Sequence, residues 1–281
     1  MPAILQKMTN ASVVTYLTDA GELSHLLRCL SQSSIDHVLV VDHSPTDSLK
    51  EIVLSFPSTE YLKAPNQGYG TGHNRALRRS LEEGADFHLV VNPDVFWEGD
   101  IIARAVAFME NHARCGLVMP KILYPDGRLQ YLCKLLPTPA DLFIRRFIPS
   151  QKFRARAAHR FELRDSGYDH VMNVPFLSGC FMLMRCDALR QVGIFDERYF
   201  MYAEDLDLCR RIGEHWDTIF FPDVEACHDY AAGSYHDRRL LRIHIASLVK
   251  YFNKWGWFFD RRRRAANSRC LRALRQKEPA E

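Results

Sequence analysis

The sequence lacks the features that would place it across a membrane or in an oxidising compartment. No apolar run reaches the roughly 18 residues needed to span a bilayer. The first residues, Met1 to Lys7, have neither the long apolar stretch nor the small-residue cleavage site of a secretory signal. The eight cysteines are scattered without a Cys-x-x-Cys pair, which disfavours a zinc ribbon or a redox motif. We therefore expect reduced thiols and a cytoplasmic protein.

Internal repeats and low-complexity linkers are also missing. What remains is ordinary globular composition, with 281 residues, 47% hydrophobic and 25% charged. This is enough apolar material for a sizeable core without a disulfide or metal staple. We expect one domain over residues 1–237, followed by a C-terminal helical extension over residues 238–281.

The net charge of +3 hides a strong asymmetry. From Arg238 to Lys277 there are 13 lysines and arginines and one acid, so this segment carries +12 and the rest of the chain −9. Six aromatic residues lie between positions 251 and 259. Clustered arginines beside aromatics suit an anionic bilayer surface, with nucleic acid or a solvated helix as alternatives. Because the acidic body offers no second basic face, we expect a membrane surface and no nucleic acid as partner.

Strand and helix signals alternate through the first 112 residues. The expected strands cover 11–17, 37–42, 59–62 and 87–91, and the expected helices 22–31, 49–54, 74–83 and 101–112. The continuous apolar runs at 37–42 and 87–91 are typical of strands buried on both faces of a parallel sheet. This order predicts an α/β fold, with a Rossmann-like mostly parallel sheet flanked by helices and a ligand crevice at the carboxyl ends of its strands.

The second half is less regular. Strands are expected at 116–120 and 218–221, and a strand with a glycine kink over 174–184. Residues 134–168, basic and punctuated by prolines, predict a loop or a helical insertion. Further helices are expected from Asp187, as a possible N-cap, to Val192, and over 205–212 and 238–254.

Three polar residues follow expected strands and can carry chemistry. Asp42 can accept a hydrogen bond from a ribose hydroxyl or a base N–H, or it can simply cap the turn after it. Asp94, behind Pro93, can hold a divalent metal that bridges phosphate oxygens, or it can be an ordinary turn residue. His228 can complete a metal site with Asp94, although a lone histidine is more often structural.

A glycine-rich segment runs from Asn66 to Asn74 and leads into a helix. Its glycines permit close backbone approach, and a helix N-terminus favours an anion. The segment matches neither the dinucleotide-binding Gly-x-Gly-x-x-Gly pattern nor a phosphate loop ending in Gly-Lys-Ser/Thr. It can bind a phosphorylated ligand, or it can be a generic turn.

Three acids, Glu204, Asp205 and Asp207, fall within four residues at an expected helix start, and Arg210 and Arg211 follow. Acids at the start and bases further on complement the helix dipole, which is a purely structural interpretation. The functional alternative is a general base, in which an aspartate accepts the proton of an attacking hydroxyl.

Taken in chain order, these segments resemble the family 2 glycosyltransferases, inverting enzymes of the GT-A fold, and most of all their bacterial rhamnosyltransferase-like members. The resemblance runs from about Val13 to Trp257. It is carried by Val13–Tyr16, Val40–Ser44, Asn66–Asn74, Asn92–Asp94, Phe176–Met184, Gln191–Glu197, Tyr202–Arg211 and His228–Ser234. The sequence departs from the family pattern at His43, where an asparagine is usual, and at Asn92, which replaces the first acid of the Asp-x-Asp element.

The resemblance implies a role for each matching residue. The nucleotide-sugar site would comprise Thr15, Tyr16, Asp42, Asn66, Gly68, Asn74, Asn92 and Asp94. Asp94 would also hold Mg²⁺ or Mn²⁺, shared with His228. Asp205 would be the base that deprotonates the acceptor hydroxyl, and Glu204 its neighbour against the acceptor or the sugar.

The implied function is transfer of a deoxyhexose such as L-rhamnose from a nucleotide-diphosphate donor, with a dTDP-sugar favoured. The acceptor would be lipid-linked or saccharide, in cell-surface polysaccharide synthesis. The protein would lie on the inner face of the cell membrane, bound through its C-terminal tail. The alternative is a catalytically silent scaffold that binds a nucleotide or a polysaccharide.

Overall fold

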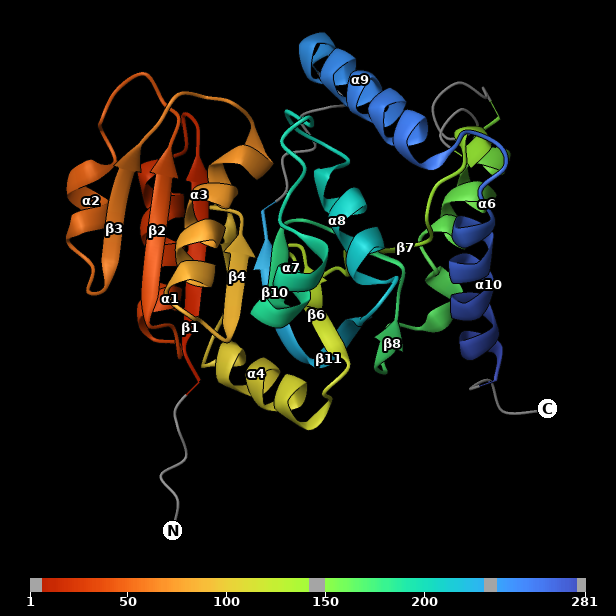
Figure 1. The fold of residues 1–281 in the computed structure, drawn as a ribbon, viewed down its shortest axis with the longest axis horizontal. Helices are drawn as coiled ribbons and strands as arrows, with labels where there is room; N and C mark the ends of the chain where they lie inside the picture. The colour runs from red at the N-terminus through yellow and green to blue at the C-terminus, as the bar shows by residue number, and fades with distance from the viewer. Residues whose placement is uncertain (1–6, 142–149, 230–236, 277–281) are drawn as a thin grey trace.

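The computed structural model describes residues 7–141, 150–229 and 237–276 (Figure 1). Its strands are β1 (Thr9–Thr15), β2 (His37–Asp42), β3 (Thr59–Lys63), β4 (Phe87–Val91), β5 (Val95–Phe96), β6 (Cys115–Leu123), β7 (Cys133–Lys134), β8 (Met172–Asn173), β9 (Phe176–Leu177), β10 (Phe181–Arg185) and β11 (Asp217–His228). Its α-helices are α1 (Ala20–Ser31), α2 (Lys50–Leu54), α3 (Tyr69–Glu82), α4 (Ile101–Asn111), α6 (Gln151–Phe161), α7 (Cys186–Val192), α8 (Glu204–Ile212), α9 (Arg238–Trp255) and α10 (Arg261–Arg275), and a 3-10 turn covers Arg164–Ser166.

A mixed, mostly parallel sheet forms the centre, with strand order β3-β2-β1-β4-β10-β6-β11-β5, while β8 pairs with β11. The strands β1, β2, β3, β4, β6 and β11 share one direction, and β10, β5 and β8 oppose it. A separate antiparallel pair joins β7 and β9. The expected α/β fold with a mostly parallel sheet is confirmed, and the antiparallel β10 joins its two parallel parts.

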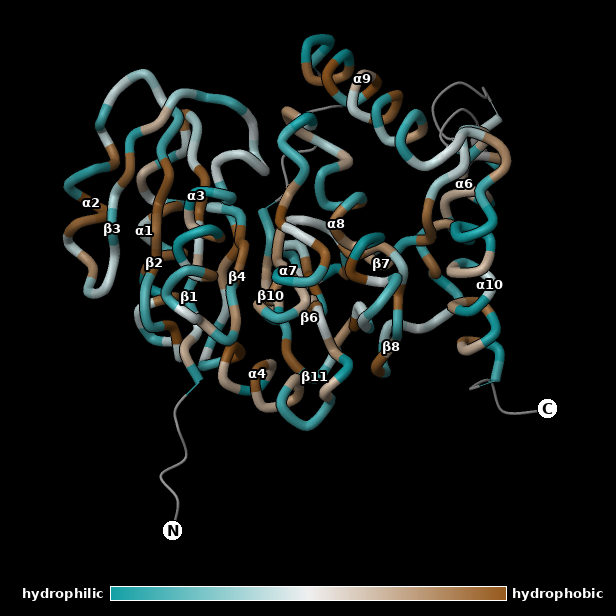
Figure 2. Tube along the Cα trace, in the orientation of Figure 1, coloured by the Kyte–Doolittle hydropathy of each residue, from teal (hydrophilic) through white to brown (hydrophobic). Residues whose placement is uncertain are grey.

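The first half follows the sequence prediction closely. Both apolar runs are buried strands, because β4 is buried throughout and β2 is buried beyond its first residue. In Figure 1 the arrowheads of β1 to β4 point to the upper edge of the view, so their carboxyl ends share one edge of the sheet. In Figure 2 the hydrophobic colour is strong along β2 and β4, which correspond to the two apolar runs.

The start of α3 differs from the prediction. We expected a glycine turn followed by a helix from Asn74, but the helix already begins at Tyr69. A Cβ on Gly70 would lie 2.9 Å from the Phe195 side chain, and one on Gly72 would lie 2.7 Å from Val14. Tight packing of the helix against its neighbours therefore explains the glycines better than a turn does, and this packing overrides their low helix propensity.

Three expectations for the second half were wrong in detail. Residues 174–184 form two short strands, β9 and β10, on either side of Gly179, because β9 leaves the main sheet to pair with β7. The strand expected at 218–221 extends to His228 across a shift of register between Phe221 and Glu225. Asp187 is not an N-cap, because Arg185 occupies that position and the Asp187 carboxylate pairs with Arg190.

The expected C-terminal helical extension is present as α9 and α10. The segment expected as a tail after residue 254 continues into α10, whose N-cap Asp260 accepts a hydrogen bond from the Arg263 backbone N–H. Tyr251 and Phe252 of α9 pack in an apolar cluster with Tyr199 and Leu206. The extension is thus attached to the body rather than projecting from it. In the part of the chain described, no helix combines the length and apolar character needed to cross a bilayer.

Candidate active site

A continuous chain of hydrogen bonds joins the end of β4 to the start of α8. The Tyr69 hydroxyl lies 2.9 Å from Asn92 Oδ1 and 2.9 Å from the Gly179 carbonyl oxygen. The Gly179 N–H in turn donates to Asp205 Oδ2 at 3.0 Å. The structure therefore brings the Asn92–Asp94 turn and Asp205 around one side chain, Tyr69, although they are far apart in sequence.

Electrostatics show the same convergence on Tyr69. Burial raises the pKa of the Tyr69 hydroxyl well above its usual range, and nearby charged groups, including Glu204, Asp205 and Asp94, add to the shift. Tyr69 therefore stays neutral and can donate its proton in a hydrogen bond to Asn92 or Gly179. It is a functional candidate that the sequence interpretation missed, although it lies inside the glycine-rich segment.

The two carboxyl groups at the start of α8 have different surroundings. Glu204 is buried, and its Oε2 atom has no hydrogen-bond partner among the described residues. Burial, then the neighbouring Asp205, raises the pKa of Glu204 well above its usual value. Burial also raises the pKa of Asp205, but the N–H groups of Leu206 and Gly179 and the Lys134 charge oppose the shift. Two neighbouring carboxyls whose environments differ in this way suit a neutral hydrogen-bond donor and an ionised base.

The remaining charged residues of α8 do not face this site. Asp207 accepts hydrogen bonds from Arg211 Nε at 2.8 Å and from Trp255 Nε1 at 2.7 Å. Arg210 is buried, donates to the Tyr251 hydroxyl and pairs with Asp260 at 2.7 Å. The acidic and basic cluster thus divides into two acids at the site and a structural set that attaches α9 and α10 to the body.

Asp94 and His228 lie against each other at the end of β11. Asp94 Oδ1 is 3.3 Å from His228 Nε2. Burial favours the neutral imidazole, but Cys180 and Asp94 outweigh it and raise the pKa of His228 to about 10. Glu22 is close enough for Asp94 to raise its pKa, after burial as the larger cause. Because the pKa of His228 is raised, its imidazole is protonated at neutral pH and offsets the Asp94 charge, so a bound cation would have to displace the Nε2 proton.

Gln130 orients the His228 ring and was not found from the sequence. Its Nε2 donates to the His228 backbone carbonyl at 2.6 Å, and its Oε1 lies 3.1 Å from His228 Nδ1. This arrangement has Nδ1–H donating to Gln130, which directs Nε2 toward Asp94. A partner of this kind on the far ring nitrogen is typical of metal-binding histidines. Gln130 carries no local sequence signal, because it follows β6 and is nearly a hundred residues from His228.

A divalent cation fits Asp94 and His228 as a partial ligand set. Neighbouring ligands of an octahedral Mg²⁺ are about 3 Å apart, close to the observed separation of the two atoms. Among the described residues no group of three or more His, Cys, Asp or Glu side chains is arranged to hold a metal ion. Diphosphate oxygens and water would therefore have to supply the other ligands.

Asp42 is fully buried at the end of β2. Its carboxylate accepts from the Thr15 hydroxyl at 3.0 Å, the Ser44 N–H at 2.9 Å and the Tyr61 hydroxyl at 2.7 Å, and Lys63 lies at 3.3 Å. Burial favours the neutral acid, but the bonds from Ser44, Tyr61 and Thr15 prevail and lower the pKa of Asp42. The structure thus gives Asp42 a strong internal role in holding the strand ends.

Tyr16, just after β1, is the opposite of Asp42, because its side chain is 52% exposed. It belongs to the same carboxyl edge of the sheet, since β1 pairs in register with β2 up to Thr15 and Asp42. An exposed aromatic ring at this edge can stack on a nucleoside base. Among the predicted nucleotide-sugar residues, Tyr16 and Asn66 are exposed, and Tyr16 is the one with an aromatic ring.

The glycine-rich segment is fastened to the loop before α8. Gly68 has φ +109°, and a Cβ there would lie 2.2 Å from the Phe200 carbonyl oxygen. Asn66 Oδ1 accepts from the Gly68 N–H at 3.2 Å. Asn74 is fully buried, and its amide exchanges two hydrogen bonds with the Phe195 backbone and a third with Glu197. These residues hold the two sides of the site together. Ser234, the last residue of the predicted motif that begins at His228, lies outside the described residues.

The class of protein follows from two features. The sheet is mostly parallel, and its carboxyl edge brings together two candidate metal ligands, Asp94 and His228, and two neighbouring carboxyls, Glu204 and Asp205. This is the arrangement of a glycosyltransferase that uses a nucleotide sugar. The family model described as "Glycosyltransferase like family 2" matches residues 13–253. The chain belongs to glycosyltransferase family 2 and is a nucleotide-sugar-dependent transferase.

Two relatives are informative. The N-acetylglucosaminyl-diphospho-decaprenol L-rhamnosyltransferase of Mycobacterium tuberculosis H37Rv is 30% identical over 233 residues, covering 76% of this chain and 74% of the relative. Rhamnosyltransferase WbbL of Escherichia coli K12 is 25% identical over 227 residues, covering 76% and 81% of the two chains.

Solved structures agree on the fold. The Pyrobaculum calidifontis mannosyltransferase PcManGT, solved with GDP-Man and Mn²⁺, superposes with a TM-score of 0.56 at 16% identity, over 97% of this chain and 76% of its own. S. aureus TarS superposes with a TM-score of 0.55 at 16% identity, over 96% of this chain but 43% of that longer chain. Both superpositions cover nearly the whole of this chain, and the expected GT-A fold is confirmed.

Proposed function

We propose that this chain transfers L-rhamnose, or a closely related deoxyhexose, from a dTDP-linked donor to a lipid-linked or saccharide acceptor in cell-surface polysaccharide synthesis. The donor sugar is supported by two relatives that are named rhamnosyltransferases. The lipid-linked acceptor is supported by the name of the mycobacterial relative, which specifies a diphospho-decaprenol substrate.

The observation that carries the proposal is the chain of hydrogen bonds from Asn92 through Tyr69 and Gly179 to Asp205. It supports a single cavity in which the donor diphosphate lies near Asp94 and the acceptor hydroxyl lies near Asp205. Asp205 acts as the base on the side opposite the leaving group, so attack at the anomeric carbon inverts it. Glu204, kept neutral by burial, donates a hydrogen bond to the acceptor or the sugar.

On the donor side we assign the nucleoside and sugar contacts to the rim around β1, β2 and α3. Tyr16 stacks on the base, supported by its exposure. Thr15, Asp42 and Asn74 act by holding the rim in shape, supported by their burial and internal hydrogen bonds. Asn66, Gly68 and Asn92 contribute polar groups and backbone close to the diphosphate.

Mg²⁺ or Mn²⁺ is proposed between Asp94, His228 and the donor diphosphate. Such an ion neutralises the charge that develops on the departing nucleoside diphosphate. The chain's own contribution is the orientation of Asp94 Oδ1 and of the His228 ring, the latter through Gln130.

We also propose that the protein works at the cytoplasmic face of the cell membrane and is held there by its C-terminal extension. The proposal is supported by the basic and aromatic character of residues 238–276, and a lipid-linked acceptor would be presented at the same surface.

A panel of nucleotide sugars tests the function. The chain is incubated with dTDP-, UDP- and GDP-sugars and a short lipid-linked N-acetylglucosaminyl diphosphate, with and without Mg²⁺. We expect the dTDP-linked deoxyhexose to give a glycosylated product and to raise the unfolding temperature by binding the native state. Donor binding without turnover on any acceptor would favour the silent scaffold instead.

A further inference from the structure

One face of α9 points away from the body and combines basic and apolar side chains. The exposed residues Arg238, Arg242, Ile245 and Val249 are spaced three or four apart and share one side of the helix. The opposite side carries the buried Ser247, which donates to the Met201 carbonyl oxygen at 2.8 Å. In Figure 2 hydrophobic and hydrophilic turns alternate along this helix. An amphipathic helix of this kind suits the boundary between water and a bilayer.

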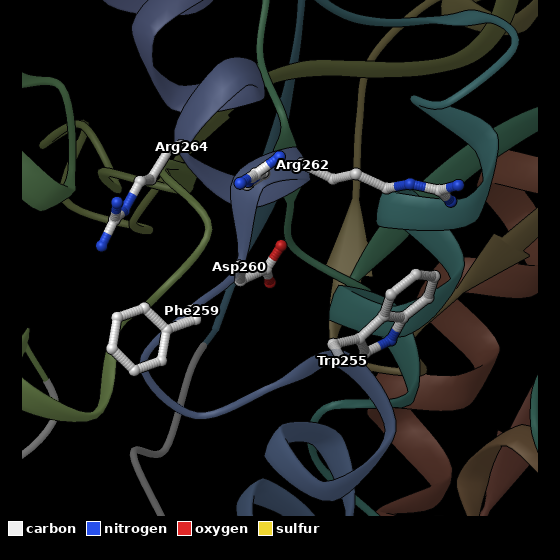
Figure 3. Close-up of a pocket in the computed structure, with 6 residues that line it drawn as sticks. Trp255, Phe259, Asp260, Arg262 and Arg264 are labelled. Atoms are coloured by element: carbon white, nitrogen blue, oxygen red, sulfur yellow. The ribbon is translucent and has the colours of Figure 1, made fainter.

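The corner between α9 and α10, at the C-terminal end of α9, carries two further exposed apolar residues. Phe258 and Phe259 are 69% and 92% exposed. Next to them a hollow of about 640 Å³ is lined by Trp255, Phe259, Asp260, Arg261, Arg262 and Arg264 (Figure 3). Arg263 is buried below and donates to the carbonyl oxygens of Pro137 and Trp257, so the corner is fixed.

The positive charge of the arginines at this corner is only partly compensated by acidic side chains of the described residues. Arg262 pairs with Glu214 at 2.9 Å, and Asp260 is already paired with Arg210. Arg261 and Arg264 form no ion pair with described residues. Positive side chains in the first turn of a helix are disfavoured by its dipole. A partner that is anionic and partly apolar would pair with these arginines and cover the exposed phenylalanines.

The same helix contacts the loop that leads to the proposed base. Lys250 Nζ donates to the Arg198 carbonyl oxygen at 2.6 Å, and the rings of Tyr202 and His244 stack at 4.7 Å. In Figure 1, α9 lies at the same upper edge as the carboxyl ends of the strands. A partner on the outer face of α9 would therefore lie beside the acceptor side of the site.

We propose that these residues form a docking surface for an anionic phospholipid bilayer, with a lipid phosphate in the arginine-lined hollow. The docking surface comprises Arg238, Arg242, Ile245, Val249, Phe258, Phe259, Arg261 and Arg264. The two phenylalanines enter the boundary between headgroups and acyl chains, and the arginines bind the phosphates. The inference deepens the proposed function, because it names the surface that brings a lipid-linked acceptor sugar to Asp205.

Vesicle flotation with the full chain tests the docking surface. Vesicles contain phosphatidylcholine alone or with phosphatidylglycerol. The variants are Phe258→Ser with Phe259→Ser, and Arg261→Glu with Arg264→Glu. The matched control is Leu54→Ser with Arg104→Glu, which removes an exposed apolar residue and an exposed arginine from α2 and α4. Thermal unfolding of each variant checks that it is folded.

We expect the parent and the control to float with anionic vesicles. Each docking variant should bind at least tenfold more weakly, since one arginine near an anionic surface contributes about fivefold. The arginine contribution should fall with added salt. Vesicle binding unchanged in both variants, or a parent that does not float, would overturn the proposal. Loss of binding to duplex DNA, with vesicle binding intact, would assign the arginines to nucleic acid instead.

Measuring turnover of the soluble donor distinguishes a failure of membrane docking from a failure of the proposed catalytic function. The docking variants should release nucleotide from the donor in solution at the parent rate, because none of the changed residues touches the site. Asp205→Asn should float like the parent while losing transfer. A docking variant that loses both vesicle binding and soluble turnover, while remaining folded, would contradict a surface that acts only in docking.

Discussion

The donor side and the acceptor side of the site are built in different ways. At the ends of β1 and β2, the polar groups on the donor side are satisfied within the chain, as Asp42 illustrates, and Asn74 of α3 is satisfied in the same way. On the acceptor side, Glu204 is buried with an oxygen that has no described partner, and the pKa values of both carboxyls are raised. The first arrangement gives a rigid rim. In the second, exclusion of water raises the pKa values of the carboxyls, which suits groups that transfer protons.

Positive φ values outside glycine occur on both sides: Leu17 after β1 has φ +54°, and on the acceptor side two consecutive residues are affected. Tyr202 and Ala203, directly before α8, have φ values of +68° and +67°. Residues other than glycine adopt this region only where their surroundings enforce it. Here the enforcing contacts come from Gly68 on one side and from α9 on the other. The position of the carboxyl pair therefore depends on distant parts of the chain.

Replacing Gly68 should break the link between the two sides. In Gly68→Ala the new Cβ would meet the Phe200 carbonyl at 2.2 Å with φ at +109°. We expect the free energy of unfolding to fall by roughly 3–5 kcal/mol. The control Gly84→Ala has φ +78° and open space around it, so it should lose only about 1–2 kcal/mol. Urea unfolding of the two variants checks this, and equal losses would mean that the close approach at Phe200 is unimportant.

Gln130→Leu tests whether Gln130 orients His228, which is a proposed metal ligand together with Asp94. Leucine has a similar size but cannot accept from His228 Nδ1 or donate to its carbonyl oxygen, so the ring is no longer held. We expect Mn²⁺ affinity in the presence of a nucleoside diphosphate to fall about 10- to 100-fold. Electron paramagnetic resonance titration measures this without turnover. The exposed control Gln32→Leu should bind Mn²⁺ normally, and an equally normal Gln130→Leu would remove Gln130 from the site.

Two fully buried histidines in the first half of the chain, His73 and His88, make stability depend on pH through their neutral state. His88 lies between the hydroxyls of Ser12, at 2.9 Å, and Ser80, at 2.8 Å, and burial lowers its pKa to about 3. Burial also lowers the pKa of His73 well below its usual value. Below pH about 6.5 the unfolded chain binds protons that the folded chain does not, so stability falls as the pH falls.

Each such histidine contributes a slope of about 1.4 kcal/mol per pH unit between pH 6 and pH 4. His88→Gln keeps hydrogen-bonding groups near Ser12 and Ser80 but removes one titration. Its free energy of unfolding, measured with urea at several pH values, should fall less steeply than that of the parent by about that amount. The exposed His112→Gln, measured in the same way, is the control for replacing a histidine. Parallel curves for His88→Gln and the parent would contradict a buried neutral His88.

Local sequence signals were sufficient to predict the elements of the donor half, which is the first 112 residues. Seven of its elements, β1 to β4 with α1, α2 and α4, begin and end within two residues of the expected positions, because their apolar periodicity and terminators are local. The start of α3 was misplaced, since packing of Gly70 and Gly72 against residues far away in sequence decides it. The family motifs also indicated which strand ends gather at the site.

The rest of the site depends on long-range contacts that no local pattern encodes. Gln130 meets His228 because β6 and β11 are neighbours, and Tyr69 meets Gly179 because β10 inserts beside β4. The structural partner of Asp207 was equally hidden from local patterns, since Asp207 binds Trp255, which belongs to α9. Spacing in the sequence identified the acidic cluster, whereas the choice of Glu204 and Asp205 within it came from the family resemblance.

The most direct test of the account compares Asp94→Asn with Asp205→Asn in donor binding and in transfer, with Asp223→Asn as an exposed control. We predict that Asp94→Asn weakens binding of the nucleotide sugar with Mg²⁺. We predict that Asp205→Asn binds the donor within about threefold of the parent but lowers kcat by about 10²- to 10⁴-fold. The opposite pattern, or normal transfer by Asp205→Asn, would contradict the assignment of donor and acceptor sides.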